Sequence, residues 1–137
     1  TVAWSLRALP SRPVVAILEY AWGGDPPPPG GMLGELLTTT LTLGLEGTAG
    51  IIGPDGTGSL VGPEDIENAR TELGACLLVS GSVRPMGPDS LVVFTQVVQT
   101  SDGVHSWAHW DTLTTAASGG DLARAVLEGT RRSLAAC

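Results

Sequence analysis

The segment GVHSWAHW, residues 103–110, holds side chains that could bind a metal, because His105 and His109 are four residues apart. On a helix this spacing would bring both imidazoles to one face. The preceding Asp-Gly pair and the Val and Trp content predict a strand instead, and four residues along a strand span roughly 13 Å. His105, Trp107 and His109 would then share one face of a sheet without sharing an ion. We therefore predict no metal site.

A second segment that could do chemistry is GDPPPPGGMLGELL, residues 24–37, which lies between an apolar strand-like run and a helical pattern. Phosphates bind in this layout at the N-terminus of a helix. A phosphate-binding loop of the form GxxxxGK[ST] needs a lysine, however, and the sequence contains none. The glycines also fall at the wrong intervals for the dinucleotide pattern GxGxxG. We interpret Gly30 and Gly31 as part of a structural loop, with anion or nucleotide binding kept as an alternative.

No arrangement of side chains predicts a catalytic centre. Ser80 and Ser82 lie in a predicted strand, without the G-x-S-x-G turn that exposes a nucleophilic serine. Carboxylates such as Asp55, Asp65 and Asp111 are scattered over turns and helix starts, where they serve as caps. We predict that the chain is not an enzyme and needs no cofactor.

Two cysteines are too few for a disulfide scaffold, and their spacing does not match a CxxC metal or redox motif. Cys76 lies in the apolar run at residues 75–79, and we predict that it is a small buried side chain without reactivity. Cys137 is the last residue of the sequence. Three alternatives stay open for it: a free thiol, a crosslink, or the boundary of a fragment.

The composition argues against nucleic-acid binding. Fourteen acidic residues outnumber seven basic ones, all of them arginine, and the net charge at pH 7 is −7. Such a chain lacks the basic stripe that displaces counterions from a nucleic-acid backbone. Only 15% of the residues are charged, against about 25% in ordinary soluble domains. This low charge leaves apolar surface available to a partner protein or to copies of the chain itself.

No apolar run reaches the roughly 18 residues that a membrane-spanning helix needs, so we predict no embedded membrane segment in this chain. Because the sequence begins with Thr1 rather than methionine, we expect that it is processed or excised from a longer chain. A signal peptide or an anchoring helix could precede it.

Apolar periodicity predicts the elements that position these residues. Residues 1–13 end in a proline-rich stretch and are predicted to be an arm or linker ahead of a single domain at residues 14–137. Strands are predicted at 14–20, 49–52, 75–83, 90–100 and 104–112, and helices at 32–45, 63–73 and 121–135. Hairpins follow an early alternation of strands and helices. We therefore predict an α/β fold with one mixed sheet, parallel first and antiparallel at its end, in the order β-α-β-α-β-β-β-α.

Several segments resemble those of a known family, in the same order. They are 14–18 (VVAIL), 24–26 (GDP), 33–41 (LGELLTTTL), 69–83 (ARTELGACLLVSGSV), 93–98 (VFTQVV) and 102–108 (DGVHSWA). Over residues 13–136 the chain is similar to the TolB amino-terminal-like domain, which in bacterial signalling and envelope proteins precedes TPR repeats or a β-propeller. It departs from the family where Tyr20-Ala21-Trp22 replaces a Pro-Phe pair. The resemblance implies a mixed α/β module without shared catalytic residues, in the bacterial cell envelope, periplasmic or extracellular rather than cytoplasmic.

The leading hypothesis is a non-catalytic protein-interaction or sensory module of a bacterial envelope or signalling protein. Tryptophan is over-represented at protein interfaces. The predicted partner-binding residues are Trp4, Trp22, Trp107 and Trp110. One alternative is a self-assembling structural subunit that uses the N-terminal arm and exposed strand edges. A second alternative is a small-ligand or nucleotide-binding domain with its site at Gly30 and Gly31.

Overall fold

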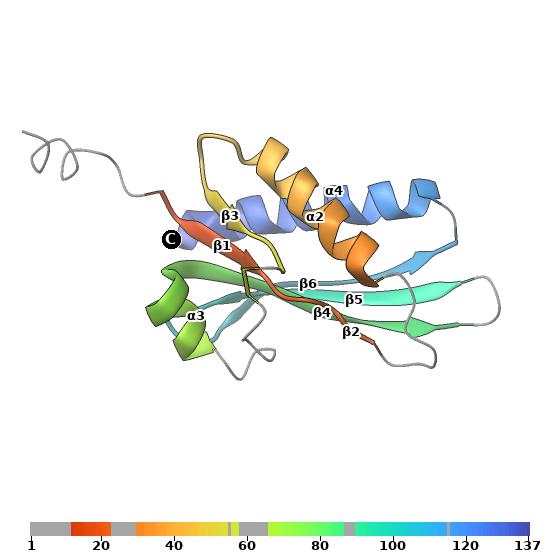
Figure 1. Ribbon diagram of the computed structural model, residues 1–137, viewed down its shortest axis with the longest axis horizontal. Coiled ribbons are helices and arrows are strands. Elements are labelled where there is room, and N and C mark those ends of the chain that lie inside the picture. The colour runs from red at the N-terminus through yellow and green to blue at the C-terminus, as the bar shows by residue number, and fades with distance from the viewer. Residues whose placement is uncertain (1–11, 23–29, 55, 58–65, 87–89, 115) are drawn as a thin grey trace, which may run out of the picture.

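The chain folds into one mixed β-sheet with helices on both faces, which confirms the predicted α/β class (Figure 1). The computed structural model describes residues 12–22, 30–54, 56–57, 66–86, 90–114 and 116–137. The predicted arm at residues 1–13 therefore lies outside the described residues, apart from Arg12 and Pro13.

Within the described residues the sheet has six strands. They are β1 (Val14–Ile17), β2 (Ala21–Trp22), β3 (Gly50–Ile52), β4 (Ala75–Pro85), β5 (Leu91–Gln99) and β6 (His105–Leu113). Their order is β3-β1-β4-β5-β6, with β1 parallel to β3 and β4, and with β4, β5 and β6 antiparallel. The predicted mixed sheet is thereby confirmed. The short β2 is an addition, because the run predicted as one strand at 14–20 breaks after Ile17 and pairs with β4 again further along.

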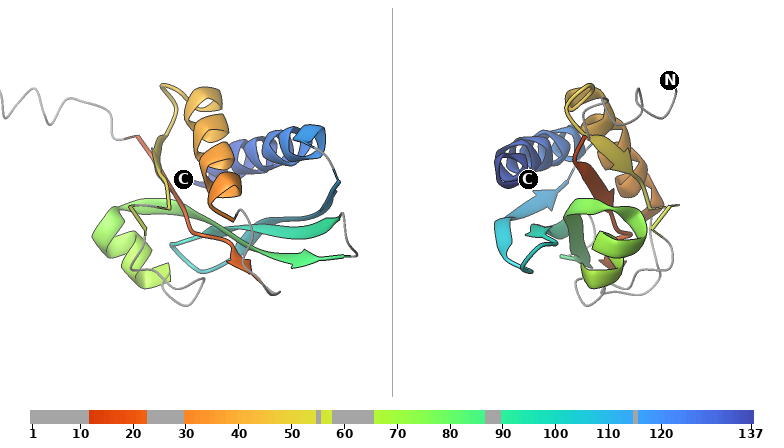
Figure 2. Two further views of the ribbon diagram at one scale, coloured as in Figure 1. Left: turned by 45° about the vertical axis from the view of Figure 1, so that its right-hand side comes forward. Right: turned by 90° about the vertical axis from the view of Figure 1, so that its left-hand side faces the viewer.

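In the part of the chain that the structure describes, three helices pack on this sheet. They are α2 (Gly30–Gly44), α3 (Ile66–Leu73) and α4 (Ala116–Ser133), which a 3₁₀ turn at Leu134–Ala136 follows. Figure 2 shows α2 and α4 together on one face of the sheet and α3 on the other. The start of α4 precedes the predicted cap at Asp121, because the helix runs through Gly119 and Gly120. A Cβ at Gly119 would lie 3.5 Å from Leu36 Cδ2 of α2, so packing between the helices offsets the poor helix propensity of glycine.

Successive side chains along the strands point to opposite faces of the sheet and pack into two separate cores. The larger core lies under α2 and α4, which contribute the buried side chains of Leu37, Leu41, Leu122 and Val126. The smaller core lies under α3 and comprises Ala16, Leu18, Ala69, Ala75, Leu78 and Val98. Since α3 has only eight residues, it covers one end of its face.

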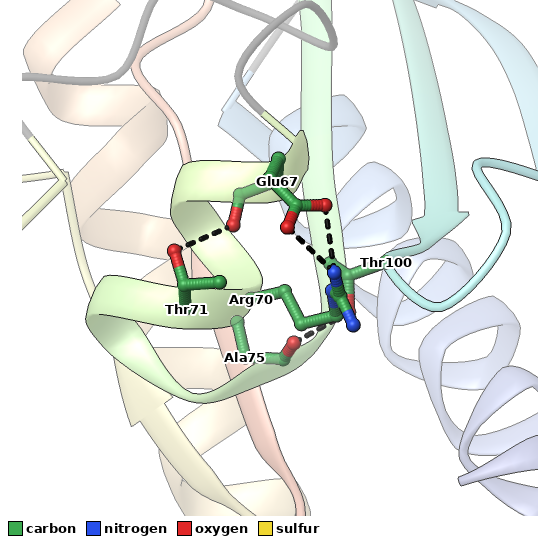
Figure 3. Close-up of polar contacts among 5 residues, drawn as sticks. All are labelled: Glu67, Arg70, Thr71, Ala75 and Thr100. Carbon is green, nitrogen blue, oxygen red and sulfur yellow. Dashed lines mark hydrogen bonds and ion pairs between the residues drawn. The ribbon is translucent and has the colours of Figure 1, made fainter.

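Polar contacts lie within α3 and at the start of β4, the strand that follows it (Figure 3). Within the helix, Arg70 Nη2 donates to both carboxylate oxygens of Glu67, at 2.6 and 2.7 Å, and the hydroxyl of Thr71 donates to the Glu67 carbonyl. After β5, the hydroxyl of Thr100 donates to the carbonyl of Ala75, the first residue of β4. Neither set of contacts joins α3 to the sheet; the apolar side chains of the smaller core do so, at one end of that face.

A β-bulge in β4 determines where Cys76 points. Val14 lies opposite Ala75 but Val15 lies opposite Leu77, so Cys76 is an extra residue in β4. Strict alternation would place Cys76 on the α3 face, whereas the bulge packs it together with Leu77 against the larger core.

Cys76 is joined to Cys137 by a disulfide, with a distance of 6.1 Å between the two Cα atoms. This bond corrects the prediction that Cys76 is an isolated, unreactive side chain. It also shows that Cys137 is crosslinked and is not a free thiol. The bulge is the physical reason, because it turns Cys76 toward the face on which α4 and the end of the chain lie.

A second bulge lies in β6, where Val97 pairs with Trp107 but Val98 pairs with His105. The extra residue is Ser106, whose hydroxyl hydrogen bonds to that of Ser133 in α4 at 2.8 Å. Both bulges therefore aim a side chain at the C-terminal end of α4 or the residues just beyond it.

Tyr20 is the one tyrosine of the sequence, and it lies in the larger core. Its hydroxyl shares a hydrogen bond of 2.8 Å with that of Thr95. Its ring lies against Gly81, where a Cβ would overlap both the ring and the Phe94 carbonyl. Burial raises the pKa of the Tyr20 phenol well above its usual value, although the hydrogen bond to Thr95 opposes this shift.

Candidate functional site

Trp110 is the most conspicuous exposed side chain on the sheet. It is 65% exposed, although it lies in the middle of β6. Its indole packs against the ring of Phe94 on β5, with ring centroids 4.7 Å apart and planes inclined by 44°. Cross-strand aromatic pairs of this kind stabilise a sheet, yet most of the indole remains available to a partner.

The aromatic pair is part of a larger surface, which we call the open face. It consists of the side chains of β4, β5 and β6 that point away from α2 and α4 and lie beyond α3, namely Ser82, Arg84, Val92, Phe94, Ala108, Trp110 and Thr112. Of the described helices, only α3 lies on this side of the sheet (Figure 2). Ser82 and Ala108 are small, so the indole of Trp110 projects beyond its neighbours.

Arg84 gives the open face a positive charge that no described carboxylate neutralises. The arginines of the helices are paired: Arg70 with Glu67, Arg124 with Asp121, and Arg131 and Arg132 with Glu128. Among the described arginines, only Arg12 and Arg84 lack such an ion pair. Because Arg84 lies directly opposite Val92 on β5, its charge borders the aromatic pair.

The four tryptophans predicted to bind a partner do not form one surface. Trp107 lies on the opposite side of the sheet from Trp110 and packs against the larger core and Gly129 of α4. The backbone of Trp22 pairs with Val83 in β2, beside the open face. Trp4 lies outside the described residues.

One of the two histidines, His105, is placed differently from the prediction. His105 was expected to share a face with Trp107 and His109, but the bulge at Ser106 pairs it with Val98 and so turns it to the other side. The His109 ring stacks on Trp107 with centroids 5.4 Å apart, and its Nε2 lies 3.7 Å from a carboxylate oxygen of Asp111. Across the described residues, no group of three or more His, Cys, Asp or Glu side chains is arranged to hold a metal ion.

Gly30 and Gly31 belong to the first turn of α2 rather than to a loop ahead of it, which corrects the predicted helix start. The preceding GDP and proline segment lies outside the described residues. Among the helices of the described residues, none is long and apolar enough to cross a membrane.

The alternation along β4 is a sequence signal for the open face that the predictions above missed. Ser82 and Arg84 alternate with Gly81, Val83 and Pro85, of which Val83 belongs to the larger core, whereas Ser80 before them is buried. Polar residues at every second position indicate that one face of a strand is not covered by another layer. Arg84 and its neighbours on this face could have been named from this pattern.

Comparison with family models and with curated proteins gives no match for this chain. Among solved structures, PelC from Paraburkholderia phytofirmans, described as a dodecamer, matches with a TM-score of 0.62 at 18% identity, over 86% of this chain and 88% of that one. TolB from Acinetobacter baumannii matches with a TM-score of 0.63 at 13% identity, over 91% of this chain and 29% of TolB. The C-terminal domain of LpoB from Escherichia coli matches with a TM-score of 0.59 at 16% identity, over 83% and 93% of the two chains.

The chain has the TolB amino-terminal-like fold. The resemblance predicted from the sequence is thereby confirmed for the architecture. At identities of 13 to 18% the likeness concerns the fold alone. The functional residues of this chain are therefore inferred from its own geometry.

Proposed function

We propose that this chain is a non-catalytic protein-binding domain of the bacterial cell envelope, and that the open face is its binding surface. The observation that carries the proposal is Trp110, which is 65% exposed and held in position by Phe94. Tryptophan and arginine are the residues most often found at the energetic centre of protein interfaces. The open face places both on a rigid sheet.

Rigidity favours binding, because a side chain that is already ordered loses little entropy when a partner arrives. Trp110 is held by β6, which pairs with β5 along nearly its whole length, and by the ring of Phe94. Trp22 borders the same face through β2 and is included in the proposal. Trp4 stays a prediction.

The disulfide supports an envelope location. Bonds such as Cys76–Cys137 form and persist in the bacterial periplasm and outside the cell, and they are rare in the cytosol. Together with the TolB-like fold, this favours a periplasmic or extracellular site of action over a cytoplasmic one.

Site-specific photo-crosslinking tests the proposal. A benzoylphenylalanine at Ala108, adjacent to Trp110 on the open face, should give a crosslinked product in native cells. The same group at Arg124, exposed on α4, is the control and should give none. The product from position 108 should be lost when Trp110 is also changed to alanine. Equal products from both positions, or no product from position 108, would contradict the proposal.

A second candidate function is a self-assembling structural subunit. It is favoured by the dodecameric PelC, which matches this chain over most of both lengths. Such a subunit need not assemble through the N-terminal arm, because the described residues include an exposed surface, the open face.

A further inference from the structure

The outward side of α2 carries two exposed apolar side chains, of which Leu36 borders α4 at Gly119. Leu36 is 37% exposed and Leu43 is 69% exposed. Residues advance by about 100° per position around a helix, so Leu36, Thr39 and Leu43 lie within one quarter turn of each other. They form a stripe on the side opposite Leu37 and Leu41, which are buried in the larger core.

Two carboxylates flank this stripe. Both are exposed: Glu35 lies on the same side of the α2 axis as Thr39, and Glu46 lies in the turn that follows the helix. Neither has an ion pair with a described cation. Arg131 of α4 approaches the end of α2, where its Nη2 donates to the Gly44 carbonyl at 3.3 Å, but its guanidinium already pairs with a carboxylate of α4.

The α2 stripe and the open face are complementary in character. One presents leucines and two carboxylates, and the other presents Trp110 and Phe94 beside the guanidinium of Arg84; none of these three charged groups has an ion pair with another described residue. They lie on opposite sides of the molecule, because α2 covers the larger core and the open face is the other side of the sheet (Figure 1). A single copy cannot bring them together, whereas two copies can.

The dimensions also agree. The 15 residues of α2 make a helix roughly 22 Å long, and β2, β4, β5 and β6 span roughly 15 to 20 Å across the sheet. A helix laid on an uncovered sheet face completes the layered arrangement that α/β sheets usually have.

We infer that the partner seated on the open face is the α2 stripe of a second copy of this chain, so that copies join head to tail. The inference rests on the proposed function, because it names the occupant of the same surface. Arg84 then pairs with Glu35 or Glu46 of the next copy, and Trp110 packs on Leu36 and Leu43. Because the two contacting surfaces differ, a pair of copies leaves one open face and one α2 stripe unused, and the assembly closes into a ring or grows into a filament.

Charge reversal tests the inference with the full oxidised chain, by measuring its mass with analytical ultracentrifugation over a range of concentrations. The wild-type chain should exceed its monomer mass of 14.0 kDa as the concentration rises. Arg84→Glu should weaken association roughly tenfold or more, and so should the pair Glu35→Arg and Glu46→Arg. Trp110→Ala should weaken it roughly thirtyfold.

The decisive measurement is the mixture of the two charge variants. Each variant restores opposite charges on the surface of the other, so an equimolar mixture should assemble where neither does alone. A single chain that carries all three reversals should also assemble. Arg124→Glu, which changes the charge of an arginine away from both surfaces, is the control and should associate like the wild type. At a concentration at which the wild type is monomeric, circular dichroism should give the same thermal midpoint for the wild type and the Arg84 and Glu35/Glu46 charge variants.

Two results would overturn the inference. One is a wild-type chain that stays monomeric at every concentration. The other is self-association that the charge variants do not alter, or that their mixture does not restore. The proposed function would survive both results if position 108 still crosslinks to a different protein in cells, since only the identity of the occupant would be wrong. Both the proposed function and the inference would be wrong if position 108 gives no crosslinked product at all.

Discussion

The indole of Trp107 on β6 lies directly against the backbone of Gly129 in α4. A Cβ at position 129 would overlap Cδ2 and Cε2 of the indole. The absence of a side chain at Gly129 therefore sets how closely α4 approaches the sheet, and with it the position of the larger core.

Gly129→Ala should destabilise the protein, because the added methyl group forces either the indole or the helix to move. Overpacking of this kind costs about 1 to 3 kcal/mol. The matched control is Gly120→Ala in the same helix, where a Cβ meets nothing within 4 Å, and which should raise the free energy of unfolding by about 0.5 to 1 kcal/mol through helix propensity. Urea denaturation measures both. Equal effects of the two substitutions would show that the contact with Trp107 is unimportant.

Loss of the disulfide should cost more than any single side chain. Cys76 and Cys137 are separated by 61 residues, and closing a loop of that length in the unfolded chain contributes about 4 kcal/mol. The double substitution Cys76→Ala and Cys137→Ser should lower the urea midpoint, and a reducing agent should lower that of the wild type by a similar amount. The double variant should not respond to the reducing agent. A wild-type midpoint that is unchanged on reduction would argue against a stabilising bond.

Tyr20 should make stability fall at alkaline pH. Its folded-state pKa is raised above the usual value of 10.0, so its contribution is complete below pH 10 and is lost as the pH rises toward the folded-state value. The expected slope above pH 10 is about −1.4 kcal/mol per pH unit.

An alkaline slope can be assigned to Tyr20, because the sequence has a single tyrosine and no lysine, and both cysteines are in the disulfide. Tyr20→Phe should abolish the alkaline slope. At pH 7 it should cost about 1 kcal/mol, since the Thr95 hydroxyl loses its partner. Denaturation curves at half-unit intervals from pH 8 to about 11 measure the slope of the free energy of unfolding against pH for the wild type and the variant. A variant that keeps the slope would assign it to another group.

Thr130 offers a route to a more stable protein. Its hydroxyl is fully buried and has no hydrogen-bond partner among the described residues. Thr130→Val removes the unsatisfied oxygen at nearly constant shape and should raise the free energy of unfolding by about 1 kcal/mol. Thr130→Ser keeps the oxygen and loses the methyl group, so it should be less stable than the wild type by about 1 kcal/mol. A destabilised valine variant would mean that the hydroxyl has a partner after all.

Most of the fold is predictable from the sequence because its signals are local. Individual elements are specified without reference to the rest of the chain by the apolar run at residues 75–79, the period-two alternation along 91–97, the Asp102-Gly103 turn and the apolar spacing around Leu37 and Leu41. The order of these elements then limits the sheet to very few topologies.

The remainder depends on contacts between distant segments. A bulge changes the phase of a strand by one residue and is visible only in its pairing with a neighbour. For this reason the predicted placements of Cys76 and His105 were wrong. The exposure of Trp110 depends on the length of α3, which ends before it reaches that part of the sheet. No pattern around Trp110 itself contains that information.

The pairing of Cys76 with Cys137 also orders events during biosynthesis. Cys137 follows every described strand and helix of the domain along the chain, so the ribosome delivers it after all of them. Cys76 must wait as an unpaired thiol while β5, β6 and α4 are made. Oxidation of this pair can therefore occur only after the last element of the domain has been synthesised, and the covalent bond marks domains that have been both completed and brought into an oxidising environment.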